Sequence, residues 1–309
     1  MKAFKKISLI SMVSIISLTV LSGCSEKNDL NSKNENKKSA ISKKVETDVN
    51  TDLLNKSGMD IESRYLLPEG YKRVEANNDS FAYFLRHEKL KPYGEKSNYY
   101  NGDKKPNQGV YDSVFDVDLE GKNLLHCADA CYKFIGDYLY KKGEYSKMRF
   151  KFVSGGVADF GKYTRGYRVD PETGEYFLMS EPSTNESVYK RFMTVVYAYS
   201  GTLSLVEDTF KVNIDDIEIG DMFVIGGTPG TKRVGHAIMV VDMAVNGNKK
   251  IVMLAQSYMP AQQTQILINK NNKAISPWYS IDEIKENGEL KTPQWTFKLD
   301  ELRRFNAQQ

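Results

Sequence analysis

Residues 235–256 read GHAIMVVDMAVNGNKKIVMLAQ. Two apolar runs, 237–242 and 251–255, flank Asn246-Gly247-Asn248 within this stretch. An Asn-Gly pair between two such runs is a strong signal for a β-hairpin. A third apolar run, 222–225, precedes them. The stretch therefore predicts an antiparallel sheet with strands at these three places.

The clearest helical pattern lies upstream, at 124–141. Its apolar residues fall on one stripe with a period of 3.6, Asn123 is placed to cap its start, and Gly143 lies beyond its end. A second helix is predicted at 186–199. Helices and strands together predict an α+β fold. The stripe comprises Leu124, Cys127, Ala128, Cys131, Ile135, Tyr138 and Leu139.

The N-terminus has the pattern of an export signal. Three lysines precede the apolar run 7–21, and small residues then lead to Cys24. The run is short for a bilayer span, so we interpret 1–23 as a signal peptide. Its ending resembles the bacterial lipobox, which implies lipidation of Cys24 and anchoring to the cell membrane outside the cytoplasm.

A disordered tether is predicted to follow the lipidated cysteine, over 24–60. Up to about residue 50 the chain is nearly all Lys, Asn, Ser and Glu and has no aromatic residue, so it cannot bury a core. The remaining residues, 61–309, are enough for a single globular domain.

The charge balance bears on the class of partner. The chain has 43 Lys and Arg against 40 Asp and Glu, and the three lysines of the leader account for the excess. The composition of a mature protein without net charge does not indicate the basic surface that nucleic-acid binding needs. The cysteines and histidines lack metal-binding spacing, and no dinucleotide or phosphate-loop motif occurs. We expect no metal, no cofactor and a monomer.

Many short motifs resemble the bacterial family known as domain of unknown function 4846. The resemblance runs from about residue 66 to 305 and implies one domain, but it implies no activity. The motifs include Leu67-Pro68-Glu69-Gly70-Tyr71, Cys127-Ala128-Asp129-Ala130, Gly235-His236-Ala237, Leu254-Ala255-Gln256-Ser257-Tyr258, Ser276-Pro277-Trp278-Tyr279 and Thr292-Pro293-Gln294-Trp295.

A cysteine and a histidine form the main catalytic candidate. Cys127 lies near the predicted helix start, where the helix dipole favours a thiolate. The hairpin places residues near Gln256 opposite those near His236, so Gln256 is a candidate to orient the imidazole. This order of elements is similar to that of NlpC-type papain-like cysteine peptidases. The similarity implies that Cys127 attacks an acyl carbon and that His236 acts as base and then acid.

Each of these three residues also has an alternative interpretation. Cys127 shares its stripe with Cys131, and buried unreactive cysteines are common. His236 starts an apolar strand, so a core histidine is its alternative interpretation, although the preceding glycines favour a functional role. Asp242 and Ser257 compete with Gln256 as the orienting residue, because a register slip of one residue exchanges the faces of a strand.

Two functions from different classes follow. The first is an envelope cysteine hydrolase that cuts amide bonds, such as those of cell-wall peptides. The second is a non-enzymatic surface lipoprotein that binds a wall peptide, a glycan or a partner protein. In either case Trp278, Tyr279 and Tyr258 are candidates to line a substrate groove, since aromatic rings stack on sugars and peptides.

Overall fold

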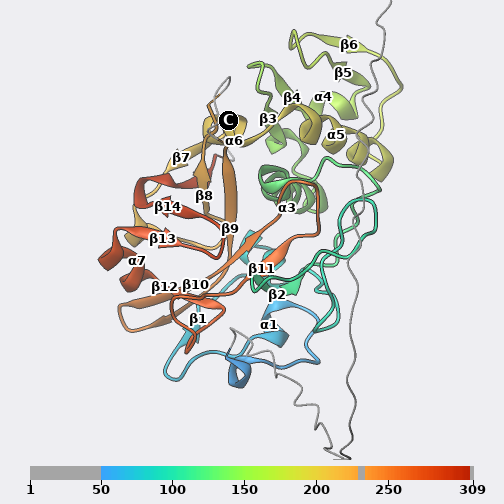
Figure 1. Ribbon diagram of the computed structural model, residues 1–309. Helices are drawn as coiled ribbons and strands as arrows, with labels where there is room; N and C mark the ends of the chain where they lie inside the picture. Colours follow the sequence, from blue (N-terminus) through green and yellow to red (C-terminus); the bar gives the residue numbers. More distant parts are fainter. Residues whose placement is uncertain (1–49, 229–233, 307–309) are drawn as a thin grey trace, which may run out of the picture. The chain divides into compact units, whose positions relative to one another are not determined.

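An antiparallel sheet of nine strands forms the centre of the protein, as a computed structural model covering residues 50–228 and 234–306 shows (Figure 1). Its strands are β1 (Lys72–Arg73), β2 (Tyr111–Val114), β7 (Thr209–Lys211), β8 (Met222–Ile225), β9 (His236–Asn246), β10 (Lys249–Gln256), β11 (Gln265–Leu267), β12 (Trp278–Ser280) and β15 (Leu302–Phe305). The order is β2-β11-β10-β9-β8-β15-β7, while β1 pairs with β9 and β12 with β10.

Helices and three small two-stranded sheets surround this sheet. The described residues form the helices α1 (Ile61–Arg64), α2 (Phe81–His87), α3 (Cys127–Lys141), α4 (Phe160–Thr164), α5 (Glu186–Tyr199), α6 (Thr202–Glu207) and α7 (Ile281–Asn287). The small sheets pair β3 (Arg149–Lys151) with β4 (Val157–Asp159), β5 (Tyr167–Val169) with β6 (Tyr176–Leu178), and β13 (Glu289–Lys291) with β14 (Thr296–Lys298). Short 3-10 turns lie at Thr51–Leu53, Tyr145–Lys147, Ile214–Asp216 and Leu299–Glu301. The α+β prediction is confirmed.

The predicted hairpin is formed by β9 and β10, the two longest strands. Asn246 pairs with Lys249 across a two-residue loop, and Gly247 takes a φ of 57° at the first loop position. Glycine adopts this left-handed conformation without steric cost, which explains the Asn-Gly signal. The strand predicted at 222–225 is β8, and it pairs with β9 on the other side.

Both faces of the β9 strand are buried. Side chains alternate along a strand, so neighbouring residues enter different hydrophobic clusters. Helices α2 and α3 cover one face, and α7 with β14 lies on the other side of the sheet (Figure 1). This double burial explains the nearly continuous apolar sequence of the hairpin. The first cluster takes Ala237, Met239 and Val241 together with Cys131 and Phe134, and the second takes Ile238 and Val240 together with Ile281 and Phe297.

Helix α3 begins three residues later than its apolar stripe predicts. His126 is the N-cap residue, and its backbone N–H donates to the Asp129 carboxylate at 3.0 Å. Asn123 does not cap the helix, because its side-chain oxygen accepts the backbone N–H of Ala261 at 2.8 Å. Cys127 is therefore the first helical residue. The second helix, α5, has the predicted bounds.

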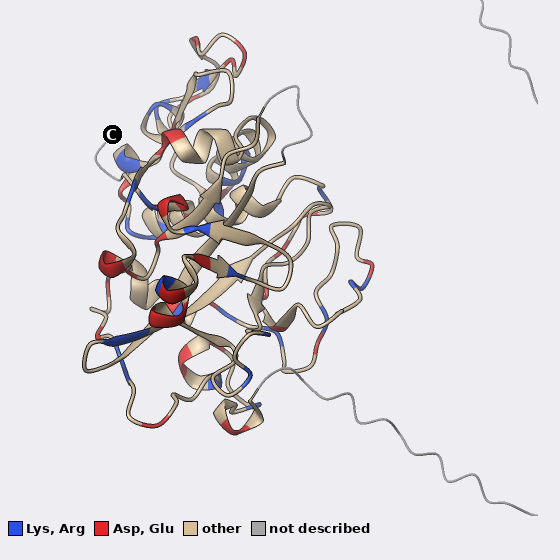
Figure 2. Cartoon of the chain, turned by 60° about the vertical axis from the view of Figure 1, so that its left-hand side comes forward, with Lys and Arg blue, Asp and Glu red and all other residues tan. Residues whose placement is uncertain are grey.

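The predicted signal peptide, Cys24 and the tether up to residue 49 lie outside the described residues. Within the described ranges, no helix is both long and apolar enough to cross a bilayer. Acidic and basic residues are interspersed along the chain (Figure 2).

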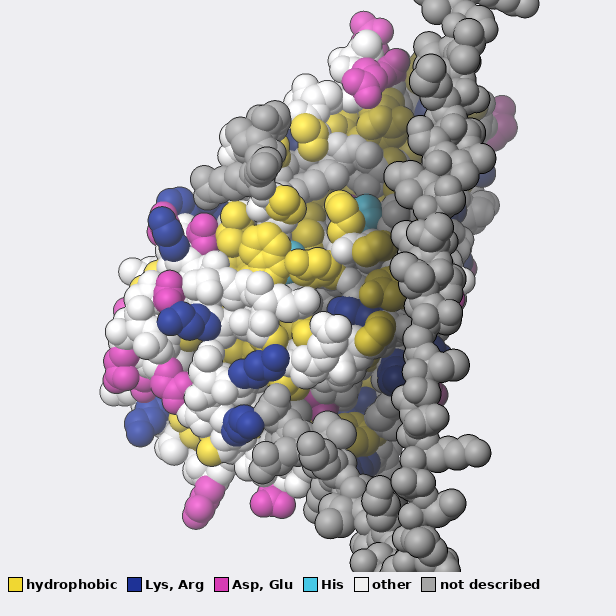
Figure 3. Space-filling view, viewed as in Figure 1, with side chains coloured by type: hydrophobic (Ala, Val, Ile, Leu, Met, Phe, Trp, Pro, Cys, Tyr) yellow, Lys and Arg dark blue, Asp and Glu magenta, His cyan; other side chains and the backbone are white. Residues whose placement is uncertain are grey.

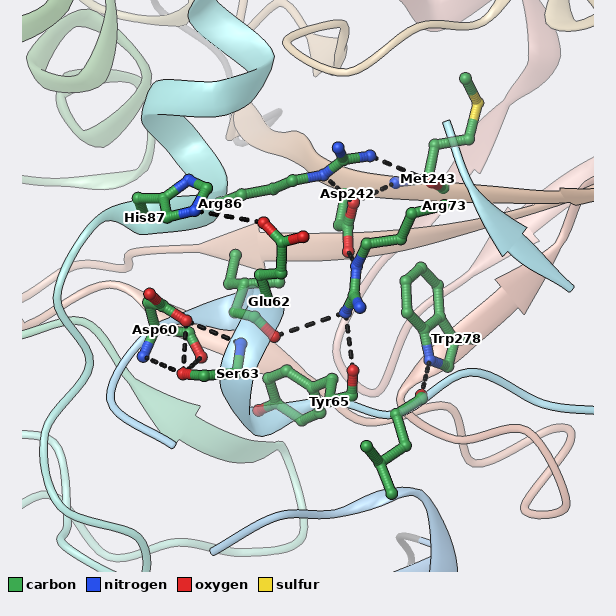
Figure 4. Close-up of polar contacts among 12 residues, drawn as sticks. Asp60, Glu62, Ser63, Tyr65, Arg73, Arg86, His87, Asp242, Met243 and Trp278 are labelled. Carbon is green, nitrogen blue, oxygen red and sulfur yellow. Dashed lines mark hydrogen bonds and ion pairs between the residues drawn. The ribbon is translucent and has the colours of Figure 1, made fainter. Parts of the chain in front are cut away.

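A buried carboxylate ties β9 to two other elements. Asp242 is fully buried, and its two oxygens accept from Arg73 Nε at 2.7 Å and Arg86 Nε at 2.6 Å (Figure 4). Arg73 belongs to β1 and also donates to the Tyr65 carbonyl at 2.7 Å. Arg86 belongs to α2 and is itself buried. A buried ion pair with both partners in place is tolerated, but removing one partner leaves an uncompensated charge.

The Asp242→Asn variant should therefore lose about 3 to 5 kcal/mol of unfolding free energy, because two buried or half-buried guanidinium groups lose their counter-charge. Urea denaturation followed by circular dichroism measures this loss. Asp300→Asn, which breaks an exposed pair with Lys211, is the matched control and should change little. Equal stability of the two variants would contradict the structural role of Asp242.

Candidate active site

The site is centred on His236 at the start of β9. Its ring is almost fully buried, with 2% of the residue exposed. The Nε2 atom lies 3.0 Å from Oε1 of Gln256, the last residue of β10. The sheet therefore brings His236 and Gln256 together at one end of the hairpin.

A shift in the strand pairing makes this contact possible. Met253 pairs with Asp242, but the next residue, Leu254, pairs with Val240, so β9 contains one extra residue at this point. Side chains alternate between the two faces of a sheet. An extra residue in one strand therefore changes which side chains of the two strands share a face beyond that point. Without the shift, Gln256 would lie on the face opposite the first side chain of β9.

Aromatic rings enclose the imidazole of His236. The Trp295 ring stacks on it with a centroid distance of 4.5 Å and an interplanar angle of 14°, and the Tyr258 ring lies 5.3 Å away. Trp295 Nε1 donates to the Tyr258 hydroxyl at 3.2 Å, which fixes the two rings relative to each other. Hydrophobic side chains gather on this face of the molecule (Figure 3).

The hydrogen bond to Gln256 selects one tautomer of His236. An amide oxygen only accepts, so Nε2 must carry the proton and Nδ1 is left with a free lone pair. Within residues 50–228 and 234–306, Nδ1 has no hydrogen-bond partner. Burial lowers the pKa of His236 to about 4. The imidazole is thus a neutral base at neutral pH.

Cys127 lies beside the same strand end. It is half-buried, and its thiol is close to the Ala237 backbone N–H and to the N–H groups at the start of α3, which act to lower its pKa. Burial outweighs these groups and raises the pKa of the Cys127 thiol to about 11. The expectation that the helix start favours a thiolate is therefore wrong for the resting protein, because desolvation opposes the charge more strongly.

The thiol and the imidazole approach the strand end from different sides. The N–H of Ala237 belongs to the peptide that follows His236 directly, so the thiol lies beside this peptide. The Ala237 side chain joins the cluster that contains α3, whereas the His236 ring contacts Trp295 and Phe297. The two reactive groups are thus placed around one peptide unit at the edge of the sheet.

The competing candidates for orienting His236 are engaged elsewhere. Asp242 binds Arg73 and Arg86. The Ser257 hydroxyl is directed to the carbonyls of Leu125 and Gln262, at 3.1 and 2.7 Å. Among the residues weighed for this position, Gln256 alone contacts the ring.

Cys131 and His126, which lie close to Cys127 in sequence, have other contacts. Cys131 is buried, its thiol faces the Cys127 carbonyl at 3.7 Å, and both cysteines are free, as their helical spacing predicts. His126 contacts Asn123 through Nε2 at 3.2 Å. Among the described residues, no group of three or more His, Cys, Asp or Glu side chains is arranged to hold a metal ion.

The aromatic candidates divide into two groups. Trp278 and Tyr279 lie in the core, with 0% and 2% of each residue exposed, and they pair with β10 through Met253 and Val252. Neither ring faces solvent, so neither lines a groove in this conformation. Tyr258 is half-buried beside His236, so it remains a candidate to line a substrate groove.

Sequence reasoning missed the residues that complete the site. Trp295 covers the imidazole, and Gln294 accepts from Gln256 Nε2 at 2.7 Å. Both belong to the motif Thr292-Pro293-Gln294-Trp295, which had no assigned role. They lie far from the hairpin in sequence, so only the tertiary fold connects them to His236.

The fold and the site define an α+β protein with a cysteine at a helix start and a histidine–glutamine pair on the adjoining sheet. The chain belongs to the family described as domain of unknown function 4846, whose model matches residues 61–304. The resemblance seen in the sequence motifs is thereby confirmed. No curated protein and no solved structure is significantly similar to the chain.

Gly235, directly before His236, occupies a site without room for a side chain. A Cβ atom there would lie 2.0 Å from the Thr202 hydroxyl oxygen and 2.7 Å from the Ile225 carbonyl oxygen. Gly235→Ala should cost about 1 to 3 kcal/mol through this overpacking and displace His236. Thermal unfolding measures the cost. Gly201→Ala is the control, since a Cβ there meets nothing within 4 Å; equal effects of both variants would contradict the steric account.

Proposed function

We propose that this protein is a cysteine hydrolase that cleaves amide bonds in cell-envelope peptides. The observation that supports this most strongly is the state of His236. Its Nε2 proton is bound by Gln256, its Nδ1 accepts from no group among residues 50–228 and 234–306, and the Cys127 thiol lies beside the next peptide. A nucleophile, a base and a group that orients the base are the elements of covalent acyl transfer.

The proposed reaction begins with a neutral thiol and a neutral imidazole. As the Cys127 sulfur attacks the carbonyl carbon, the thiol and the imidazole turn toward each other from their two sides of the strand end, and the thiol proton passes to His236 Nδ1. The imidazolium then gives this proton to the leaving amine, the C–N bond breaks, and a thioester remains. A water molecule, deprotonated by the same nitrogen, attacks the thioester, and the release of a carboxylic acid restores the thiol.

Backbone groups at the start of α3 are suited to stabilise the transition state. The first N–H groups of a helix have no intrahelical partner and carry partial positive charge. Those of Cys127 and Ala128 are directed toward the thiol region. They are placed to donate to the oxyanion that forms when the sulfur adds to a carbonyl.

A papain-like core and an extracytoplasmic location belong to the same proposal. Helix α3 packs on β9 of an antiparallel sheet, and Cys127 and His236 occupy the helix start and the strand start. The leader and the motif ending at Cys24 favour a lipid anchor on the bacterial cell membrane, where cell-wall peptides are the abundant amide substrates. The balanced charge gives no basis for nucleic-acid binding, and we propose that the protein is a monomer.

A separate cavity favours the alternative, a surface lipoprotein that binds a wall fragment without cleaving it. This cavity has a volume of about 380 Å³ and lies between α3 and α5. Tyr140, Tyr189 and Tyr197 contribute to its lining, together with several acidic and basic side chains. Rings and mixed charges of this kind suit a glycan or a peptide.

Alkylation of Cys127 by iodoacetamide at about pH 7 separates the two functions. An inert buried thiol with a pKa of about 11 should react more slowly than the same thiol in denatured protein, because its thiolate fraction is smaller. The hydrolase should react faster than the denatured control, since His236 removes the proton. His236→Gln should then reduce the rate by about 10² to 10⁴-fold.

His87→Ala is the matched control, because His87 is exposed and lies on α2, where its ring contacts Tyr83 and Glu62. Its labelling rate should equal that of the wild type. Peptide mapping assigns the adduct to Cys127 and not to Cys131. Labelling of the native wild type at or below the rate of the denatured protein, unaffected by His236→Gln, would refute the hydrolase and leave the binding protein.

A further inference from the structure

Lys105 is a buried cation close to the site. The residue is 8% exposed and lies in a segment that pairs with the main sheet region through the Tyr99–Gln262 bridge. Its backbone N–H donates to the Ser97 carbonyl at 2.8 Å, which fixes the chain at this point. Its Nζ atom donates to Gln265 Oε1 at 3.2 Å.

No carboxylate neutralises this ammonium group within the part of the chain that the structure describes. Lys91, which is buried to the same degree, forms an ion pair with Glu95 at 3.3 Å. Burying an unpaired charge is costly, and burial lowers the pKa of Lys105 to about 8. The group is still mostly protonated at neutral pH. An ammonium has three donors, so Lys105 retains donors for an anion.

Tyr258 connects Lys105 to His236. The Lys105 ammonium lies 6.0 Å from the centre of the Tyr258 ring, and the centre of the imidazole lies 5.3 Å from the same ring. The same segment approaches Cys127 as well, because Tyr100 donates its backbone N–H to the carbonyl of Ala261 at 2.9 Å. Ala261 in turn donates to the side chain of Asn123, just before α3. The Tyr258 ring therefore lies within 6.0 Å of both the cation and the imidazole, and the segment of Lys105 is hydrogen-bonded to the one that contacts Asn123.

We propose that Lys105 binds a carboxylate of the substrate, so that the protein acts on acidic peptides with a free carboxylate near the scissile amide. This inference rests on the proposed hydrolase function. A carboxylate is favoured over a phosphate because one ammonium beside amide oxygens matches a single negative charge. A phosphate usually needs more donors than one ammonium supplies, such as further cations, backbone N–H groups or the fork of an arginine.

Two alkylating reagents of nearly equal shape test this proposal. Iodoacetate carries a carboxylate where iodoacetamide carries an amide. With either reagent the Cys127 sulfur displaces iodide from the CH₂ carbon and loses its proton, so it gains a carboxymethyl or a carbamidomethyl group. The rate ratio of iodoacetate to iodoacetamide therefore reports the charge near the thiol, independently of its intrinsic reactivity. The ratio should be higher in the folded wild type than in the denatured protein.

Lys105→Met removes the charge and leaves an unbranched side chain that is one atom shorter. It should lower the ratio by roughly fivefold or more, because solvent screens the attraction between a buried ammonium and the carboxylate of iodoacetate only weakly. Lys104→Met, at the adjacent exposed position, removes the same charge from the surface and should change the ratio less than twofold. Circular dichroism checks that both variants fold.

The outcomes separate this inference from the hydrolase. If Cys127 is alkylated fast and in a His236-dependent way, but the ratio of iodoacetate to iodoacetamide rates is the same in Lys105→Met, the carboxylate site is overturned and the hydrolase stands. If Cys127 is alkylated slowly, but the rate ratio still falls in Lys105→Met, the anion site is supported and the hydrolase is overturned. Equal ratios in the folded and the denatured wild type would also overturn the carboxylate site, even if Lys105→Met fails to fold.

Discussion

The pairing of β9 with β10 is the constraint on which the rest of the site depends. The tight turn at Gly247 sets the register at one end, and the extra residue of β9 opposite Met253 and Leu254 changes it midway. Beyond this point Gln256 shares a face with the first residue of β9 and binds its ring. Before it, Asp242 faces the arginines of β1 and α2. One bulge thereby serves both the buried ion pair and the imidazole contact.

Burial determines the chemistry that this arrangement can support. A thiolate and an imidazolium are both disfavoured at the edge of a doubly covered sheet, so burial raises the pKa of Cys127 and lowers that of His236. The resting pair is therefore neutral, and charge has to develop only during the reaction. Proton transfer from sulfur to Nδ1, with helix N–H groups beside the forming oxyanion, is consistent with such a site. The half-buried Trp295 and Tyr258 rings limit the access of water to the imidazole.

Local signals in the sequence were enough for the main elements but not for the full site. The Asn-Gly turn, the strand at 222–225 and the helix at 186–199 were predicted because turn chemistry and periodicity are local properties. The start of α3 was misplaced, since Asn123 forms a tertiary contact with Ala261 that no local pattern reveals. The bulge in β9 carries no clear sequence signal. The stacking of Trp295 on His236 joins segments that are distant in the chain, and the burial of Trp278 depends on its pairing with β10.

The tautomer and charge of His236 test the account most directly. Nitrogen-15 NMR of the imidazole groups can report both, and with three histidines in the chain the His236→Gln variant assigns the signal. We expect a proton on Nε2, an unprotonated Nδ1, and a ring that stays neutral until the pH falls to about 4. A proton on Nδ1 at neutral pH, or protonation of the ring near its ordinary pKa of about 6.5, would contradict it.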